Sequence, residues 1–130
     1  MLKYYIMKKF QILVMLLWLS VCLAGAVESK IRLVHGPYLQ NLGPDEVTIV
    51  WLSDKPSVGW VELAPDDDTN FYATERPKYY DARNGVKNTS TIHNVKIKGL
   101  KPGTNYRYRV FVQEVLRHVG HKIIDGNYAS

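Results

Sequence analysis

The residues of this 130-residue chain that could bind a metal ion or act as an acid–base pair are few and scattered. The four histidines lack the spacing expected of the ligands of a zinc or dinuclear metal site. The sequence also shows no recognisable Ser-His-Asp set and no glycine-rich loop for a phosphate group. We therefore expect no catalytic residue, no metal ligand and no cofactor-binding residue in this chain. The histidines are His35, His93, His118 and His121.

Three of these histidines have a simple structural explanation. His93 alternates with Val95 and Ile97, which predicts that it caps the core on its strand. His118 and His121 are expected in a hairpin turn.

The acidic run Asp66-Asp67-Asp68 raises the question of a calcium loop. Such a loop places its ligands at alternating positions, with a glycine and a distal bidentate glutamate, and none of these features follows the run. We interpret it as a solvent-exposed acidic turn.

The next segment, residues 71–84, is rich in tyrosine and basic residues and is expected to be a loop with one or two short edge strands. Aromatic side chains beside arginines could contact a glycan, a protein or another domain. We favour the alternative, in which the loop packs its own aromatics against the edge of the fold. The candidate contact residues are Phe71, Tyr72, Tyr79 and Tyr80.

Strands are expected to position these side chains, because apolar residues alternate along much of the chain. Val47 and Trp51 share one face of a predicted strand at residues 46–53, where Trp51 would lie in the core. A predicted turn at residues 54–57 leads to another strand at residues 59–63.

The clearest pattern is a corner between two strands. Pro102-Gly103 predicts a turn, and Tyr106 and Tyr108 alternate with arginines after it. Tyr106 stands where β-sandwich domains place a tyrosine whose hydroxyl bonds to the upstream backbone, and Leu100 would close the core before the corner. The sequence predicts an all-β fold of the fibronectin type III or immunoglobulin-like sandwich class.

Two stretches resemble one family. Residues 93–110 read His-x-Val-x-Ile-x-Gly-Leu-x-Pro-Gly-Thr-x-Tyr-x-Tyr-x-Val and resemble the corner of the fibronectin type III-like N-terminal domain of purple acid phosphatases and related secreted metallophosphoesterases. Gly-Pro-Tyr-Leu-Gln at 36–40 with Asp-Glu-Val-Thr-Ile-Val-Trp at 45–51 is similar to the opening of the bacterial members. The resemblance covers about residues 32–130.

The resemblance implies a non-catalytic N-terminal domain that packs against a phosphatase catalytic domain. The full-length enzyme would hydrolyse phosphate monoesters with two metal ions, held by motifs such as Gly-Asp-x-x-Tyr, Gly-Asn-His-Glu and Gly-His-x-His. Here Gly120-His121-Lys122-Ile123 lacks the second histidine, and Asp125-Gly126-Asn127-Tyr128 lacks the preceding glycine. We expect the chain to be inactive alone, with a dinuclear metal centre only in a full-length member. The alternative is a free-standing exported sandwich that binds a protein or glycan.

The end of the chain is expected to leave the sandwich without its last strand. Ile123-Ile124 is too short to close a sheet, and Gly126-Asn127 interrupts the pattern. The chain is then interpreted as a fragment of a phosphatase, and residues 27–130 form its single domain.

The net charge of +5 does not indicate a nucleic-acid partner. Three lysines lie in the first 26 residues, which hold no acid, and the rest of the chain has 14 basic and 12 acidic residues. No basic run and no zinc-ligand spacing supports binding of nucleic acid.

The first 26 residues have the pattern of a signal peptide. A lysine-containing start precedes an apolar run at residues 12–19, and Ala24-Gly25-Ala26 fits a signal-peptidase site. The domain would then be exported to the periplasm, cell surface or medium. Two alternatives are an uncleaved anchor and a lipoprotein, since Leu19-Ser20-Val21-Cys22 resembles a lipoprotein box with valine where a small residue is expected. Cleavage after Ala26 would leave the exported chain without cysteine, and so without a disulfide.

We predict that the exported chain begins at Val27, because Ala24 and Ala26 are small enough for the peptidase pocket. Mass analysis of the exported protein's N-terminus measures this directly. A diacylglycerol-modified Cys22 at the new terminus would contradict the prediction and make the chain a lipoprotein.

Overall fold

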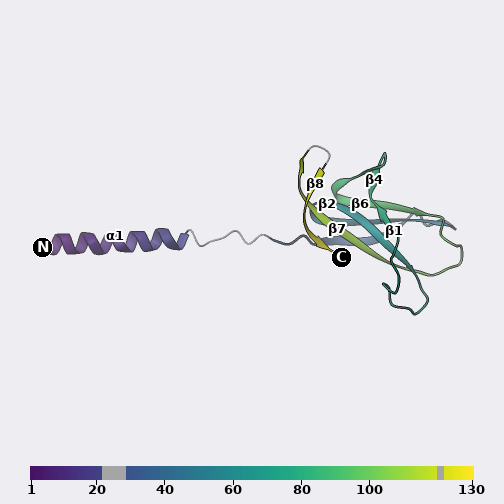
Figure 1. Ribbon diagram of the computed structural model, residues 1–130, viewed down its shortest axis with the longest axis horizontal. Coiled ribbons are helices and arrows are strands. Elements are labelled where there is room, and N and C mark those ends of the chain that lie inside the picture. Colours follow the sequence, from purple (N-terminus) through teal and green to yellow (C-terminus); the bar gives the residue numbers. More distant parts are fainter. Residues whose placement is uncertain (22–28, 120–121) are drawn as a thin grey trace.

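A computed structural model describes residues 1–21, 29–119 and 122–130 of the chain. The first element is the helix α1 (Leu2–Val21) (Figure 1). Among the described residues, no helix combines the length and the apolar character needed to cross a membrane. All remaining elements are strands, so the prediction of an all-β domain after an N-terminal helix is confirmed.

The strands of the domain pair antiparallel throughout. They are β1 (Leu33–Gln40), β2 (Glu46–Pro65), β3 (Lys78–Tyr80), β4 (Ala82–Arg83), β5 (Val86–Lys87), β6 (Thr89–Lys98), β7 (Tyr106–Val119) and β8 (Lys122–Ala129).

The long strand β2 takes part in both layers of the sandwich (Figure 1). Its first half pairs with β1 and β6, whereas its second half, from Ser57 to Pro65, pairs with β7 and also with β3. The pairing with β6 shifts register between Leu52 and Ser57, which marks where the strand passes from one layer to the other.

The prediction of two strands separated by a turn at residues 54–57 is therefore wrong. This segment stays extended and bends, as strands do at a bulge or a sandwich corner. Pro56, which has no backbone N–H to contribute to a ladder, lies where the ladder with β6 is interrupted.

The core lies between the two layers and follows the alternation seen in the sequence. Trp51 is fully buried, with Ile49 of the same strand beside it. Val61 and Val112 bring the second layer to this core, and Val95 and Ile97 come from β6. Trp51 thus occupies the core position expected for it.

The corner before β7 has the expected geometry. The backbone N–H of Lys101 donates to the Tyr106 hydroxyl oxygen at 2.9 Å. Leu100 and Tyr108 are partly buried against the core. Gly103 has a φ of +64°, a conformation in which glycine is favoured because it carries no Cβ.

The expectation that the last strand is missing is wrong for the part of β7 from Val112 to Val119, which strand β8 covers. Strand β8 pairs with β7 from Val119↔Lys122 to Val112↔Ala129, and β7 itself runs to Val119. Gly126 lies where the register shifts, and a Cβ there would meet the Glu114 side chain at 3.1 Å. The strand therefore continues through this glycine, at a point where the neighbouring side chains approach closely.

We predict that Tyr106→Phe lowers the free energy of unfolding by about 1 kcal/mol, because it removes the oxygen that accepts from Lys101. Urea denaturation of the variant and the parent chain measures the difference. Tyr38→Phe is the matched control, since Tyr38 is half exposed on β1, and it should change little. Equal midpoints for Tyr106→Phe and the parent would show that the corner bond does not contribute to stability.

Candidate functional site: a buried polar network at the bend of β2

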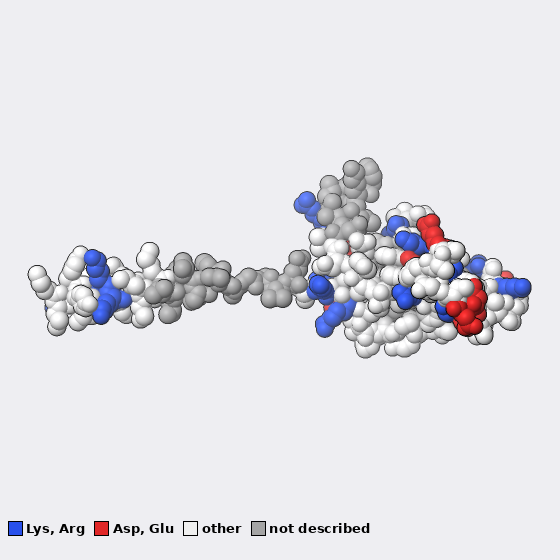
Figure 2. All heavy atoms as spheres, turned by 60° about the horizontal axis from the view of Figure 1, so that its bottom comes forward, with Lys and Arg blue, Asp and Glu red and all other residues white. Residues whose placement is uncertain are grey.

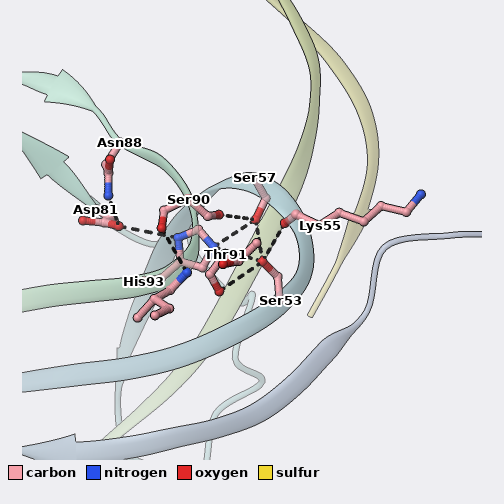
Figure 3. Close-up of polar contacts among 9 residues, drawn as sticks. Ser53, Lys55, Ser57, Asp81, Asn88, Ser90, Thr91 and His93 are labelled. Atoms are coloured by element: carbon pink, nitrogen blue, oxygen red, sulfur yellow. Dashed lines mark hydrogen bonds and ion pairs between the residues drawn. The ribbon is translucent and has the colours of Figure 1, made fainter.

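A cluster of hydrogen-bonded serine, histidine and aspartate side chains lies inside the sandwich, where β2 bends (Figure 3). Ser53 and Ser57 flank the bend on β2, and His93 reaches them from the neighbouring strand β6. Asp81 follows β3 and approaches His93 from the other side. Three segments far apart in the sequence thus supply one cluster.

The network runs in the order aspartate, histidine, serine. His93 Nε2 lies 2.9 Å from Ser57 Oγ and 3.3 Å from Ser53 Oγ, and the two hydroxyl oxygens are 2.9 Å apart. On the opposite side of the ring, Nδ1 faces Asp81 Oδ2 at 3.5 Å, an ion-pair distance longer than an ordinary hydrogen bond. The Asn88 side-chain amide donates to the same carboxylate oxygen at 3.1 Å.

Backbone carbonyl groups complete the network. Ser53 Oγ lies 2.8 Å from the carbonyl oxygen of Lys55, and Ser57 Oγ lies 3.3 Å from that of Ser90. A hydroxyl has one hydrogen to donate, so Ser57 can donate either to the Ser90 carbonyl or to His93 Nε2. Nε2 can therefore accept from Ser57 when the ring is neutral or donate to it when both ring nitrogens carry hydrogen.

Burial decides the charge of His93. Its side chain is fully buried and stacks on Trp51 with ring centroids 5.3 Å apart. Burial in these surroundings lowers the pKa of His93 below its ordinary value of 6.5, and the nearby Asp81 carboxylate opposes this shift only in part. The imidazole is therefore neutral at pH 7.

A glycine provides the space for the ring. A Cβ at Gly59 would lie 2.5 Å from His93 Nδ1 and 2.9 Å from Trp51 Cζ2, closer than non-bonded atoms can approach. Gly59 is thus the residue of β2 that lets the two rings stack against the backbone.

The order Asp81–His93–Ser57 has the connectivity of a serine-hydrolase triad, but its burial excludes that chemistry. Both Ser57 and His93 have no solvent exposure, so a substrate carbonyl has no route to the hydroxyl. We interpret the network as a buried polar centre of the domain, in which the two serine hydroxyls are hydrogen-bonded and His93 Nδ1 has only the 3.5 Å contact with Asp81.

Sequence reasoning did not recognise this set, because its members lie on separate elements without motif spacing. The alternation of His93 with Val95 and Ile97 was the one usable signal, and the expected burial of His93 is observed.

The other histidines lie apart from this network. His35 is exposed on β1. His118 is exposed near the end of β7, so its predicted place in a turn is wrong, and His121 lies outside the described residues. Across the described segments, no three histidine, cysteine, aspartate or glutamate side chains come together in a way that could hold a metal ion.

The acidic run forms a turn. Asp67 Oδ1 accepts hydrogen bonds from the Thr69 hydroxyl at 2.7 Å and the Thr69 backbone N–H at 3.2 Å. The hydrogen bond from the Thr69 hydroxyl contributes most to lowering the pKa of Asp67. The bond from the Thr69 N–H and the positive charge of Arg107 lower it further. The space-filling view shows acidic side chains gathered beside basic ones on one part of the domain surface (Figure 2).

The aromatic residues proposed as a contact surface separate into two groups. Phe71 is buried, with the guanidinium groups of Arg76 and Arg109 over its ring, and Tyr79 packs partly buried against the core. The burial of Phe71 leaves little of its ring for an external contact, whereas the contact role of the partly buried Tyr79 stays a prediction.

The other two aromatic residues remain reachable from solvent. Tyr72 is half exposed beside Arg109, and Tyr80 is partly exposed against Trp60 with centroids 5.8 Å apart.

The family model described as "Purple acid Phosphatase, N-terminal domain" matches residues 35–121, which span β1 to the end of β7. The chain belongs to this family. Neither the curated proteins nor the solved structures contain a match to the chain. The match indicates a non-catalytic module of such phosphatases.

We predict that Gly59→Ala lowers the free energy of unfolding by about 1–3 kcal/mol, because the new methyl group overlaps the His93 ring. Chemical denaturation measures the loss. In a His93→Ala background the same change should cost less, since the two closest overlaps, with the His93 ring, are removed and only the 2.9 Å approach to Trp51 is left. An equal loss in both backgrounds would contradict the contact.

Proposed function

We propose that this chain is the non-catalytic N-terminal domain of a secreted purple acid phosphatase-like metallophosphoesterase, packed against a catalytic domain that hydrolyses phosphate monoesters with two metal ions. The observation that carries the proposal is the family match across residues 35–121. In this account the metal ligands belong to the catalytic domain, and residues 1–26 direct export.

One surface of the sandwich supports this arrangement. β8 pairs with β7 only from Val112 onward, so the part of β7 from Tyr106 to Phe111 has one edge without a strand partner among the described residues. An apolar cleft of about 410 Å³ lies at this end of the sandwich. Its apolar lining includes Leu39, Val47, Ile49, Leu63, Leu100 and Tyr108.

We infer that a strand of the complete phosphatase covers this edge. A segment that continues the register of β8 would stand opposite Val110 and Tyr108, and its alternate side chains would share their face. Tyr108 and Val110 belong to the core face, so these side chains would enter the cleft. An uncovered strand edge otherwise favours association between chains.

A second candidate is a free-standing exported module that binds a protein or glycan. The observation in its favour is the half-exposed ring of Tyr72, which lies beside the Arg109 guanidinium at 5.2 Å. The reading frame after the codon for Ser130 separates the two candidates. A frame with Gly-Asp and Gly-Asn-His-Glu motifs supports the phosphatase, and a stop codon supports the module.

We predict that residues 27–130 alone are marginally stable and tend to associate, and that an added strand corrects both properties. The test appends a short segment to Ser130 whose apolar residues alternate in the register of β8. The melting temperature should rise by several degrees, since about 1 kcal/mol corresponds to roughly 4–8 °C in a domain of this size.

The matched control carries the same segment shifted by one residue, which turns its polar side chains toward the cleft. Light scattering and thermal unfolding compare the three proteins. A monomeric parent that gains nothing from either segment would show that the sandwich is already complete.

A further inference from the structure

Arg109 lies on the part of β7 that has one edge without a strand partner among the described residues. Its other edge pairs with β2, where Arg109 stands opposite Glu62, and β8 pairs with β7 only from Val112 onward. The neighbouring Val110 belongs to the core, so the Arg109 side chain lies on the outer face of the layer. A strand that covers the open edge therefore places one of its residues directly beside Arg109.

The guanidinium group of Arg109 is held in place without being neutralised. Its Cζ lies 5.1 Å from the centre of the Phe71 ring and 5.2 Å from that of the Tyr72 ring. Contact with aromatic rings orients a guanidinium group and leaves its N–H donors free for an acceptor. Arg109 is exposed, and in the part of the chain that the structure describes no carboxylate lies within ion-pair distance of it.

The carboxylate of Glu62, directly opposite Arg109 on β2, is engaged by other groups. Its Oε1 accepts a hydrogen bond from the Trp60 indole N–H at 3.3 Å and lies 4.0 Å from the Lys78 ammonium. Glu62 thus has a cation of its own, and it forms no ion pair with Arg109.

The other arginine of this stretch, Arg107, already has acceptors. Its Nη2 donates to Asp67 Oδ1 at 3.3 Å, and its Nε donates to the Pro65 carbonyl at 3.0 Å. Of the two arginines, Arg109 is therefore the one whose charge is left for a partner.

Pairing of this edge with a second copy of the chain would bring arginines together. Two such edges that pair antiparallel must keep their core faces on the same side. With Tyr108 opposite Tyr108, Arg107 then stands opposite Arg109, and in the next register Arg109 stands opposite itself. Like charges directly opposite each other destabilise a strand pair, so association through this edge would have to overcome their repulsion. The edge suits a strand of the opposite charge better than a second copy.

We propose that the strand that covers this edge carries an acidic residue opposite Arg109, between apolar residues that enter the cleft. The inference rests on the proposed function, in which a strand of the complete phosphatase continues the register of β8. Since Val112 pairs with Ala129, the second residue after Ser130 in that register stands opposite Arg109. Directly opposite residues have Cβ atoms about 4.5–5.5 Å apart, so a carboxylate there reaches the free donors of the guanidinium group.

Segments appended to the full chain test the charge at this position. Three versions share the apolar residues that enter the cleft and carry Glu, Gln or Lys as the second residue after Ser130. Chemical denaturation at low salt should give a folding equilibrium constant about 1.4- to 5-fold higher for Glu than for Gln, and lower for Lys by a similar factor. In about 1 M salt, where the screening length falls to about 3 Å, these differences should largely vanish.

A substitution in the domain identifies the residue responsible. Arg109→Gln should remove the difference between the Glu and Lys segments. Arg117→Gln is the matched control and should leave the difference unchanged, because Arg117 is also exposed on β7 but stands opposite Ile124, where β8 already covers the edge. A difference that persists in the Arg109→Gln chain would overturn the proposal.

Two results separate this proposal from the function on which it rests. If all three segments stabilise the chain equally, a strand covers the edge, as the proposed function requires, but the preference for an acidic residue is refuted. If no segment stabilises the chain, the covering strand itself is contradicted, and the acidic position is contradicted with it.

Discussion

The bend of β2 is the constraint on which the rest of the domain depends. One strand serves both layers, so its ladder with β6 breaks between Leu52 and Ser57, where the side chains of Ser53 and Ser57 are buried although Asp54 and Pro56 are exposed. Polar groups left without partners in such a place cost about 1–3 kcal/mol each. The hydroxyls of Ser53 and Ser57, together with His93, supply these partners and allow the layers to close over Trp51.

The same network shows why geometry alone does not establish function. Asp81, His93 and Ser57 follow one another as in a hydrolase, but the enclosing strands remove the access that catalysis requires. The chain belongs to the family of purple acid phosphatase N-terminal domains, and the burial of this array removes it as an argument for hydrolase chemistry.

Much of the fold could be predicted from the sequence, because local patterns determine it. The alternation of apolar residues predicts the buried positions of Trp51 and His93. Pro102-Gly103 and Tyr106 predict the corner in which the Lys101 N–H donates to the Tyr106 hydroxyl. The features missed depend on contacts between distant segments. A bend and a turn at residues 54–57 look alike in the sequence, and only the pairing with β7 shows which one forms.

The candidate site was largely beyond prediction for the same reason. The contact of Asp81 with His93 depends on where β3 ends, and the contact of Ser57 with His93 depends on the bend of β2. Gly126 was expected to interrupt the strand, although it lies within β8 at a register shift in the pairing with β7. Phe71 is buried and Tyr72 is half exposed, although the two residues are adjacent in the sequence.

The most direct test of this account is a double-mutant cycle between Ser57→Ala and His93→Gln, measured by chemical denaturation. If the bend is held by the network, the two substitutions share an interaction and their effects on the free energy of unfolding differ from additivity by about 0.5–3 kcal/mol. Effects that add to within about 0.3–0.5 kcal/mol would contradict the account, because independent sites behave in that way.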